Sequence, residues 1–179
     1  MYKLSKWWKP GAPGELRSTP WLHPAAVAYI EMLLEPKFRV LEHGGGGSTL
    51  WFSDRVAEVV THEHDDEYLL ALSKVVPDNV SLRRDKPHGH DLEPHSFDLM
   101  LIDGTRDNRV PWAMQAAELV KPGGVVVFDN PNRPDHNYPR GRNYLRAVSA
   151  HHITFEVNPP GHSYATTDFY RMPGGVDWI

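Results

Sequence analysis

The sequence predicts a single α/β domain, built as a doubly wound, mostly parallel sheet with a C-terminal antiparallel hairpin. Strand-like and helical segments alternate along the chain, which implies parallel strands joined by right-handed crossovers. Residues 99–102 and 125–128 are unbroken apolar runs, as expected of central strands covered on both faces. The last two strand-like segments are separated by a short turn with the sequence Asn-Pro-Pro-Gly, which favours a hairpin.

The individual elements follow from periodicity and from helix-stop residues. Residues 24–34 place Val27, Ile30, Leu33 and Leu34 on one helical face, and Pro36 ends that helix. The later elements are expected in chain order as a strand at 38–41, a helix at 48–55, a strand at 56–61, a helix at 65–74, strands at 80–84 and 97–102, a helix at 111–120, a strand at 124–128, a helix at 144–151, and strands at 153–157 and 164–171. Residues 85–96 and 130–142 are rich in proline and glycine, so we expect loops there, the second one covering the ligand site.

Length and composition limit the classes of function. The 179 residues suit one domain, which we place at 21–179 behind an irregular N-terminal arm at 1–20. The chain has no cysteine, which excludes disulfides and thiolate chemistry and is compatible with a cytoplasmic protein. No apolar run has the length of a membrane span, so we expect no membrane partner. The net charge of −4 argues against a nucleic-acid partner.

Two features after the first two strands indicate a nucleoside site. Ligands of open α/β sheets bind beyond the carboxyl ends of the strands. The first strand is followed by Glu42, His43, four glycines and Ser48, and such a turn lets a ligand approach the backbone. Glu63 follows the second strand and is suited to accept hydrogen bonds from ribose hydroxyls. A merely tight strand-to-helix turn is the alternative, and these features alone do not separate a nicotinamide dinucleotide from S-adenosylmethionine (SAM).

Several motifs in order resemble those of one enzyme family. Glu42-x-Gly44-x-Gly46 looks like an E/D-x-G-x-G signature, and residues 61–65 resemble the acidic segment of a second strand. Residues 97–104 resemble a fourth-strand motif, and residues 119–129 resemble an L-x-P-G-G turn into a fifth strand. Together with the final hairpin, these segments resemble the class I SAM-dependent methyltransferases, which have a Rossmann-like fold, over residues 24–172.

This resemblance implies a set of cofactor-binding residues. The glycine turn and Glu42 would border the methionine part of SAM, and Glu63 would hold the ribose. Asp85 would lie near the adenine amino group, and Ser48 stands where the family has its third glycine. The expected SAM-binding residues are Glu42, Gly44, Gly45, Gly46, Gly47, Ser48, Glu63, Asp85 and Asp103.

The ends of the fourth and fifth strands suggest a metal site. Asp103, Asp129 and Asn130 would meet there, and their oxygens suit Mg²⁺. The set is similar to the metal ligands of catechol-type O-methyltransferases, in which the ion binds and acidifies the acceptor hydroxyl. The alternative is that Asp103 contacts SAM while the other two residues only cap the strand and the turn.

The acceptor side departs from that group in one respect. Arg106 stands where the group has a lysine base, and a guanidinium cannot act as a base near neutral pH. Asp103 and His136 are therefore the candidate catalytic residues. Arg106 and Arg133 are the candidate substrate-binding residues, because arginine forks suit an anionic acceptor.

We expect SAM-dependent methylation of a small polar acceptor, with a hydroxyl as the target. A nicotinamide-dependent oxidoreductase is one alternative, and the final hairpin counts against it. A non-catalytic SAM-binding protein with the same fold is another, and the intact glycine turn counts against a decayed site. The identity of the acceptor and the oligomeric state do not follow from the sequence.

Overall fold

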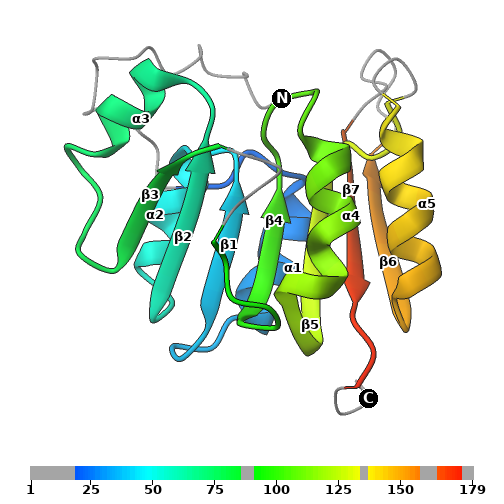
Figure 1. The fold of residues 1–179 in the computed structure, drawn as a ribbon. Coiled ribbons are helices and arrows are strands. Elements are labelled where there is room, and N and C mark those ends of the chain that lie inside the picture. Colours follow the sequence, from blue (N-terminus) through cyan, green and yellow to red (C-terminus); the bar gives the residue numbers. More distant parts are fainter. Residues whose placement is uncertain (1–18, 86–90, 134–136, 158–164, 175–179) are drawn as a thin grey trace.

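The computed structural model describes residues 19–85, 91–133, 137–157 and 165–174 (Figure 1). Residues 1–18, most of the predicted arm, and His136 lie outside these described residues. The helices and strands are α1 (Pro24–Leu33), β1 (Arg39–His43), α2 (Gly47–Ser53), β2 (Glu58–Glu63), α3 (Asp66–Leu72), β3 (Val80–Arg84), β4 (Phe97–Ile102), α4 (Arg109–Leu119), β5 (Val120–Asp129), α5 (Tyr138–Val148), β6 (His151–Val157) and β7 (Ala165–Arg171).

The strands form a seven-stranded sheet in the order β3-β2-β1-β4-β5-β7-β6. The strands from β3 to β5 are parallel, whereas β7 pairs antiparallel with both β5 and β6. The predicted doubly wound sheet with a final antiparallel hairpin is therefore confirmed. The strand order reverses between β1 and β4, and this reversal is where sheets of this type bind ligands.

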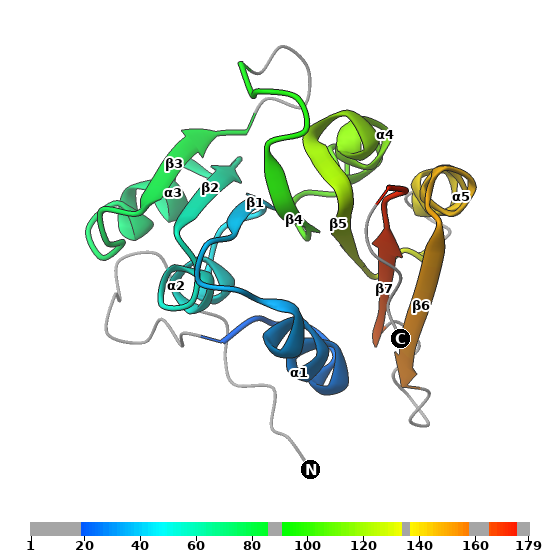
Figure 2. The same cartoon turned by 90° about the horizontal axis from the view of Figure 1, so that it is seen from below.

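Helices cover both faces of the sheet. In Figure 2, α1, α2 and α3 lie on one face, and α4 and α5 lie on the other. Neighbouring strand residues alternate between the two resulting cores, so that Val40 packs with Ile30 and Phe52, and Leu41 belongs to the core that contains Trp112. Burial on both faces explains why the central strands are unbroken apolar runs.

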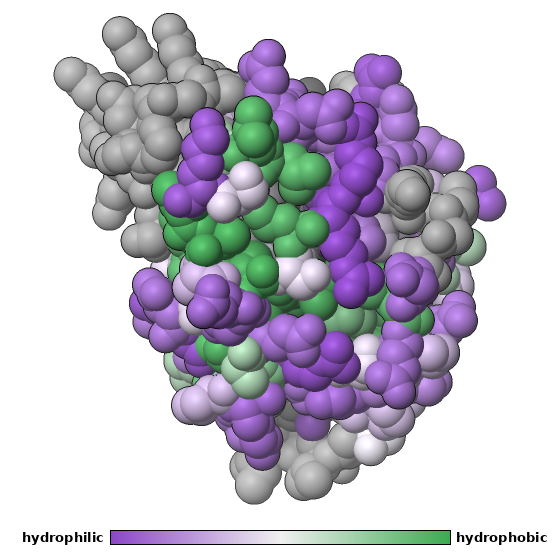
Figure 3. Space-filling model, turned by 60° about the vertical axis from the view of Figure 1, so that its left-hand side comes forward, coloured by the Kyte–Doolittle hydropathy of each residue, from purple (hydrophilic) through white to green (hydrophobic). Residues whose placement is uncertain are grey.

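The surface at the β3 edge carries apolar side chains. Figure 3 brings this side of the molecule forward and shows apolar side chains rimmed by hydrophilic ones. Among the residues of α3, Leu70 is 61% exposed. Within the described part of the chain, no helix has the length and apolarity needed to cross a bilayer.

The prediction for residues 130–151 was partly wrong. Helix α5 begins at Tyr138, so residues 138–142 are helical and belong to no covering loop. Pro139 stands in the first helical turn, where its missing N–H costs nothing. Gly141 is buried against α4 and β5, and a Cβ there would lie 3.1 Å from Ala113 and from Phe128. The proline and glycine content of residues 130–142 had favoured a loop, but close packing within a helix explains the glycine.

Candidate functional site

The glycine turn after β1 lies at the carboxyl edge of the sheet. Gly44 has a φ of +96°, and a Cβ there would lie 2.6 Å from the Cα of Gly104, so the turn requires glycine at this position. A Cβ on Gly46 would meet no atom within 4 Å among the described residues, so this side of the turn is open. Gly47 and Ser48 form the first turn of α2. The turn is therefore tight against β4 and open on the side from which a ligand would approach.

Glu42 is a buried carboxylate with one unsatisfied oxygen. Its Oε2 accepts hydrogen bonds from the hydroxyls of Thr49, at 2.5 Å, and Thr61, at 2.9 Å. Its Oε1 is buried and has no hydrogen-bond partner among the described residues. Burial raises the pKa of Glu42 to about 7, although the nearby hydroxyls of Ser48, Thr49 and Thr61 oppose this. A cationic group at Oε1 would satisfy this oxygen and favour the ionised carboxylate.

Glu63 at the end of β2 connects the glycine turn to α3. Its Oε2 accepts the N–H of Gly45 at 2.7 Å, and its Oε1 accepts the N–H of Asp65 at 2.7 Å. His64 pairs with Oε1, also at 2.7 Å. A carboxylate oxygen has two acceptor directions, so Oε2 retains one for a hydroxyl donor beside the turn.

Asp85, just after β3, is held by three side chains. Its carboxylate contacts Nε2 of His43 at 2.9 Å, and it accepts hydrogen bonds from Nδ2 of Asn108 at 2.6 Å and from Nε1 of Trp112 at 2.9 Å. Burial tends to raise the pKa of Asp85, but these partners outweigh it and lower the pKa to about 2. The adenine contact expected for Asp85 stays a prediction, and the structure shows that this carboxylate organises the α4 side of the site.

His43 connects Asp85 to the turn after β4. Its Nδ1 accepts the N–H of Gly104 at 3.2 Å, so its proton lies on Nε2 and is donated to Asp85. The ring is 1% exposed, and burial lowers its pKa, although Asp85 opposes this. A buried, neutral imidazole thus fixes the ends of β1, β3 and β4 relative to one another.

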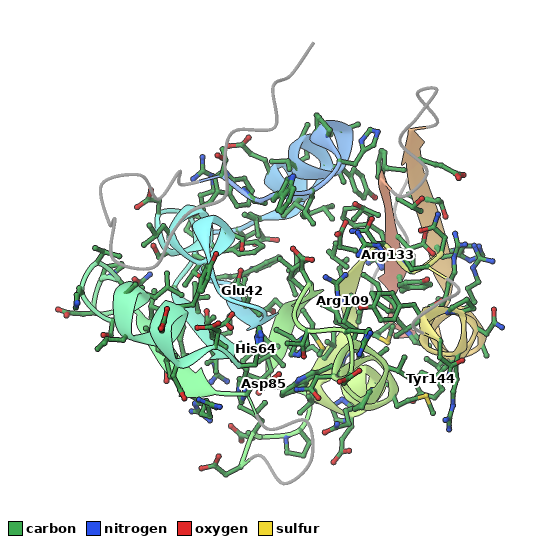
Figure 4. The ribbon with its side chains drawn as sticks, turned by 90° about the horizontal axis from the view of Figure 1, so that it is seen from above. Glu42, His64, Asp85, Arg109, Arg133 and Tyr144 are labelled. Atoms are coloured by element: carbon green, nitrogen blue, oxygen red, sulfur yellow. The ribbon has the colours of Figure 1, made fainter. Side chains whose placement is uncertain are left out.

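Arg109, the first residue of α4, lies between the two acids at the ends of β4 and β5. Its Nη2 donates to Asp103 Oδ1 at 2.7 Å, and its Nη1 lies 3.9 Å from Asp129 Oδ2. The guanidinium also donates to the backbone oxygens of Gly104, at 2.7 Å, and Asp129, at 2.6 Å. Figure 4 views the side chains from above and shows Glu42, Asp85 and Arg109 near the middle of this edge, with Tyr144 displaced toward α5.

The two acids differ in their surroundings. The side chain of Asp129 is 7% exposed, and that of Asp103 is 26% exposed. Burial raises the pKa of Asp129 well above its usual value, and the charge of Asp103 adds to this effect. Burial also raises the pKa of Asp103, while Arg109 opposes it. Asp103 is therefore the acid whose side chain reaches the surface of the site, and Asp129 lies buried beside it.

The predicted Mg²⁺ ligands do meet, but the residues do not fit a metal. Asp103 and Asp129 share Arg109 as their countercharge. Asn130 directs its amide nitrogen at Asp129 Oδ2, so its side chain acts as a donor to that acid. Among the described residues, no group of three or more histidine, aspartate or glutamate side chains is arranged to hold a metal. The structure therefore does not support the metal expectation, because the Arg109 guanidinium lies between the two acids as their cation.

The arginines predicted to bind an acceptor have different surroundings. The side chain of Arg106 is 62% exposed and pairs with Asp107 at 3.1 Å, so it faces solvent. Arg142, which was not among the predicted residues, lies on α5 and pairs with Asp168 at 2.7 Å. Arg133 is half-buried, and its positive charge acts on Asp129 and Tyr138. Arg133 therefore acts on the same two groups as Arg109, and Figure 4 shows both arginines at the carboxyl edge of the sheet.

Sequence analysis missed the partners of the predicted site residues. Arg109 was not among the candidate substrate-binding residues, and no role was predicted for His43. One signal could have singled out Arg109: a cation at the start of a helix is unfavourable unless acids compensate it. A cavity of about 170 Å³, lined by His95, Ala117, Val120 and other residues near the start of β5, lies away from this carboxyl edge.

The fold matches solved SAM-dependent methyltransferases. The tRNA (m1A58) methyltransferase TrmI of Aquifex aeolicus has a TM-score of 0.67 and 19% identity, with 89% of this chain and 72% of that chain covered. A SAM-dependent O-methyltransferase of Thermotoga maritima has a TM-score of 0.67 and 18% identity, with 89% and 69% covered. An O-methyltransferase of Bacillus cereus in complex with SAH has a TM-score of 0.66 and 21% identity, with 90% and 86% covered.

No protein-family model matches the chain, and no curated protein matches it either. At these identities the structural likeness establishes the fold. The function must be argued from the residues of the site.

Proposed function

We propose that this protein is a SAM-dependent methyltransferase that acts on a small polar acceptor, with a hydroxyl as the methylated group. The observation that carries the proposal is the unsatisfied buried oxygen of Glu42, located at a glycine turn that is open on its outer side. SAM bears an ammonium and a sulfonium, and either would supply the positive charge that this oxygen lacks. Glu42 also lies on β1, beside the switch point of the strand order, and open α/β sheets usually bind ligands at that point, which supports the proposal.

Each part of the site has a distinct task in this proposal. Glu42 binds the positively charged end of the cofactor, and Glu63 accepts a hydrogen bond from its ribose. When bound, SAM supplies a sulfonium methyl group that is transferred by in-line displacement. The remaining task of the protein is to align the acceptor with that group. Asp103, the more exposed of the paired acids, is the residue we assign to the acceptor hydroxyl and its proton.

The alternatives are weaker on specific grounds. A dinucleotide-binding Rossmann domain continues its parallel sheet to a sixth strand, whereas here β7 runs antiparallel beside β5. One structural neighbour methylates tRNA, but the net charge of −4 disfavours binding of a nucleic-acid backbone. Two other neighbours are O-methyltransferases, which supports a hydroxyl acceptor.

Calorimetry with SAM and SAH tests the cofactor assignment. Glu63→Gln should weaken both ligands by at least about tenfold, because hydrogen bonds to a charged group are worth roughly 1.5–3 kcal/mol each. Glu58→Gln is the matched control, since Glu58 stands at the other end of the same strand and pairs with Arg39. Equal affinity in the two variants would remove Glu63 from the site. Binding of a nicotinamide dinucleotide without SAM binding would refute the proposal.

Transfer of a labelled methyl group tests catalysis. The panel should contain small hydroxylated compounds and unmodified tRNA. Label in the small compounds is the expected result. Label in tRNA would show that the acceptor is a nucleic acid and not a small molecule. Tight SAM binding without any transfer would favour the non-catalytic alternative.

A further inference from the structure

We infer that Arg109 is a built-in cation that takes the place of a divalent metal at the acceptor side of the site. This inference rests on the proposed function for its role in methyl transfer, but its geometry stands independently. Arg109 would be a positioning residue that holds Asp103 toward the acceptor without contacting the reacting atoms.

The contacts of Arg109 are those of a fixed bridging cation. The fork joins Asp103 Oδ1, at 2.7 Å, to Asp129, whose backbone oxygen lies at 2.6 Å and whose Oδ2 lies at 3.9 Å. The carbonyl of Gly104 fixes Nε at 2.7 Å. The guanidinium carbon stands 5.3 Å from the centre of the Tyr138 ring, so α5 contributes a cation–π contact. Three segments, the turn after β4, the end of β5 and the start of α5, therefore converge on one side chain that is 9% exposed.

A second cation is incompatible with this arrangement. Mg²⁺ or Mn²⁺ would need to bind a carboxylate oxygen at about 2.1 Å. Asp103 Oδ1, which would be one of these oxygens, already lies 2.7 Å from Nη2 of Arg109. Repulsion between the two cations would be strong in this buried location. Asn130, the third predicted ligand, directs its amide nitrogen at Asp129 Oδ2 as a donor. Its amide oxygen is therefore turned away from the carboxylate with which it would share a metal.

The consequence is a site whose acceptor end is complete without an ion. Asp103 keeps one oxygen on Arg109 and can present the other at the surface of the site, where its side chain is 26% exposed. A guanidinium keeps its positive charge near neutral pH. Because it is part of the chain, it cannot leave the site as a bound metal ion can. The position of Asp103 is therefore set by the chain itself.

Manganese binding tests the inference independently of activity. We would titrate Mn²⁺ into wild type and follow the electron paramagnetic resonance signal of the free ion, with and without SAH. No loss of signal is expected. Arg109→Gln, which removes the charge but keeps a polar side chain, should bind Mn²⁺ at least about tenfold more tightly than wild type, because even at an effective dielectric of about 20 the repulsion it removes exceeds that free energy. Arg109→Lys, which keeps the charge, should not gain binding.

The site of any new binding is checked with Arg109→Gln/Asp103→Asn, which should lose it. Circular dichroism reports whether each variant is folded. Mn²⁺ binding by wild type that disappears in Asp103→Asn would overturn the inference, and this comparison decides the matter even if Arg109→Gln does not fold. A folded Arg109→Gln that gains no Mn²⁺ would also overturn it. Absence of SAH binding in wild type would instead refute the proposed function and leave these manganese results interpretable.

Discussion

Gly104→Ala should destabilise the protein severely, because Gly104 packs closely against the buried imidazole ring of His43. A Cβ at this position would lie 2.3 Å from Cε1 and 2.5 Å from Nδ1 of His43. The imidazole is 1% exposed and is held by Asp85, so relief of the clash would break that hydrogen bond. Overpacking costs about 1–3 kcal/mol, and loss of a hydrogen bond to a charged group costs about 1.5–3 kcal/mol. We expect the free energy of unfolding to fall by about 3–5 kcal/mol.

Urea unfolding measures this change as a lower midpoint at constant slope. His43→Ala should make Gly104→Ala much less harmful, because it removes the ring that the new Cβ would meet. The coupling energy of the double-mutant cycle should reach at least about 2 kcal/mol. Gly46→Ala is the matched control, since its Cβ would meet no atom of the described residues within 4 Å. A Gly104→Ala variant as stable as wild type, or additive effects in the cycle, would refute the reasoning.

Three further predictions concern the same edge of the sheet. Gly46→Ala should leave unfolding unchanged but weaken SAM binding in calorimetry, because its methyl group would occupy the open side of the turn. Burial raises the pKa of Glu42 from 4.5 to about 7, so the folded state takes up a proton in this interval. The free energy of unfolding should therefore fall by about 3 kcal/mol as pH rises from 4.5 to 7. SAM affinity should rise over the upper part of the same pH range. Glu42→Gln should flatten both pH profiles. The pKa of Asp85 is lowered to about 2, so the stabilisation that this carboxylate provides is present above pH 4 and is lost toward pH 2. Asp85→Asn should lower the free energy of unfolding in urea at pH 7 by about 2 kcal/mol. An unchanged value would contradict the assigned contacts.

Local pattern was sufficient to predict most of the fold. The bounds predicted for β3 and β4 agree with the structure, because apolar runs between turn residues mark buried strands. The alternation of elements was enough to predict the parallel sheet and the final hairpin. Helix α5 was placed six residues too late, because Gly141 was judged by backbone propensity. Its actual constraint is contact with Ala113 and Phe128, which no local pattern contains.

The site was predictable only as a location. The rule that ligands bind at the carboxyl ends of parallel strands brought Glu42, Glu63, Asp103 and Asp129 to one edge, and the structure places them there. Which side chain pairs with which depends on contacts between residues far apart in sequence. Asp85 and His43 are 42 positions apart, and their hydrogen bond could not be inferred from spacing.

Arg109 shows how a local conflict can indicate a site. The first turn of α4 contains no acid, and its first residue is a cation directed at the positive end of the helix dipole. Such a residue is stabilised only when negative charge reaches it from elsewhere in the fold. The ends of β4 and β5 supply that charge through Asp103 and Asp129, and both acids would repel each other in a buried site without it. Arg109 thus neutralises the two acids, and the two acids compensate the unfavourable position of Arg109 at the start of the helix. For this reason, the strand ends that suggested a metal site in the sequence hold a guanidinium in the structure.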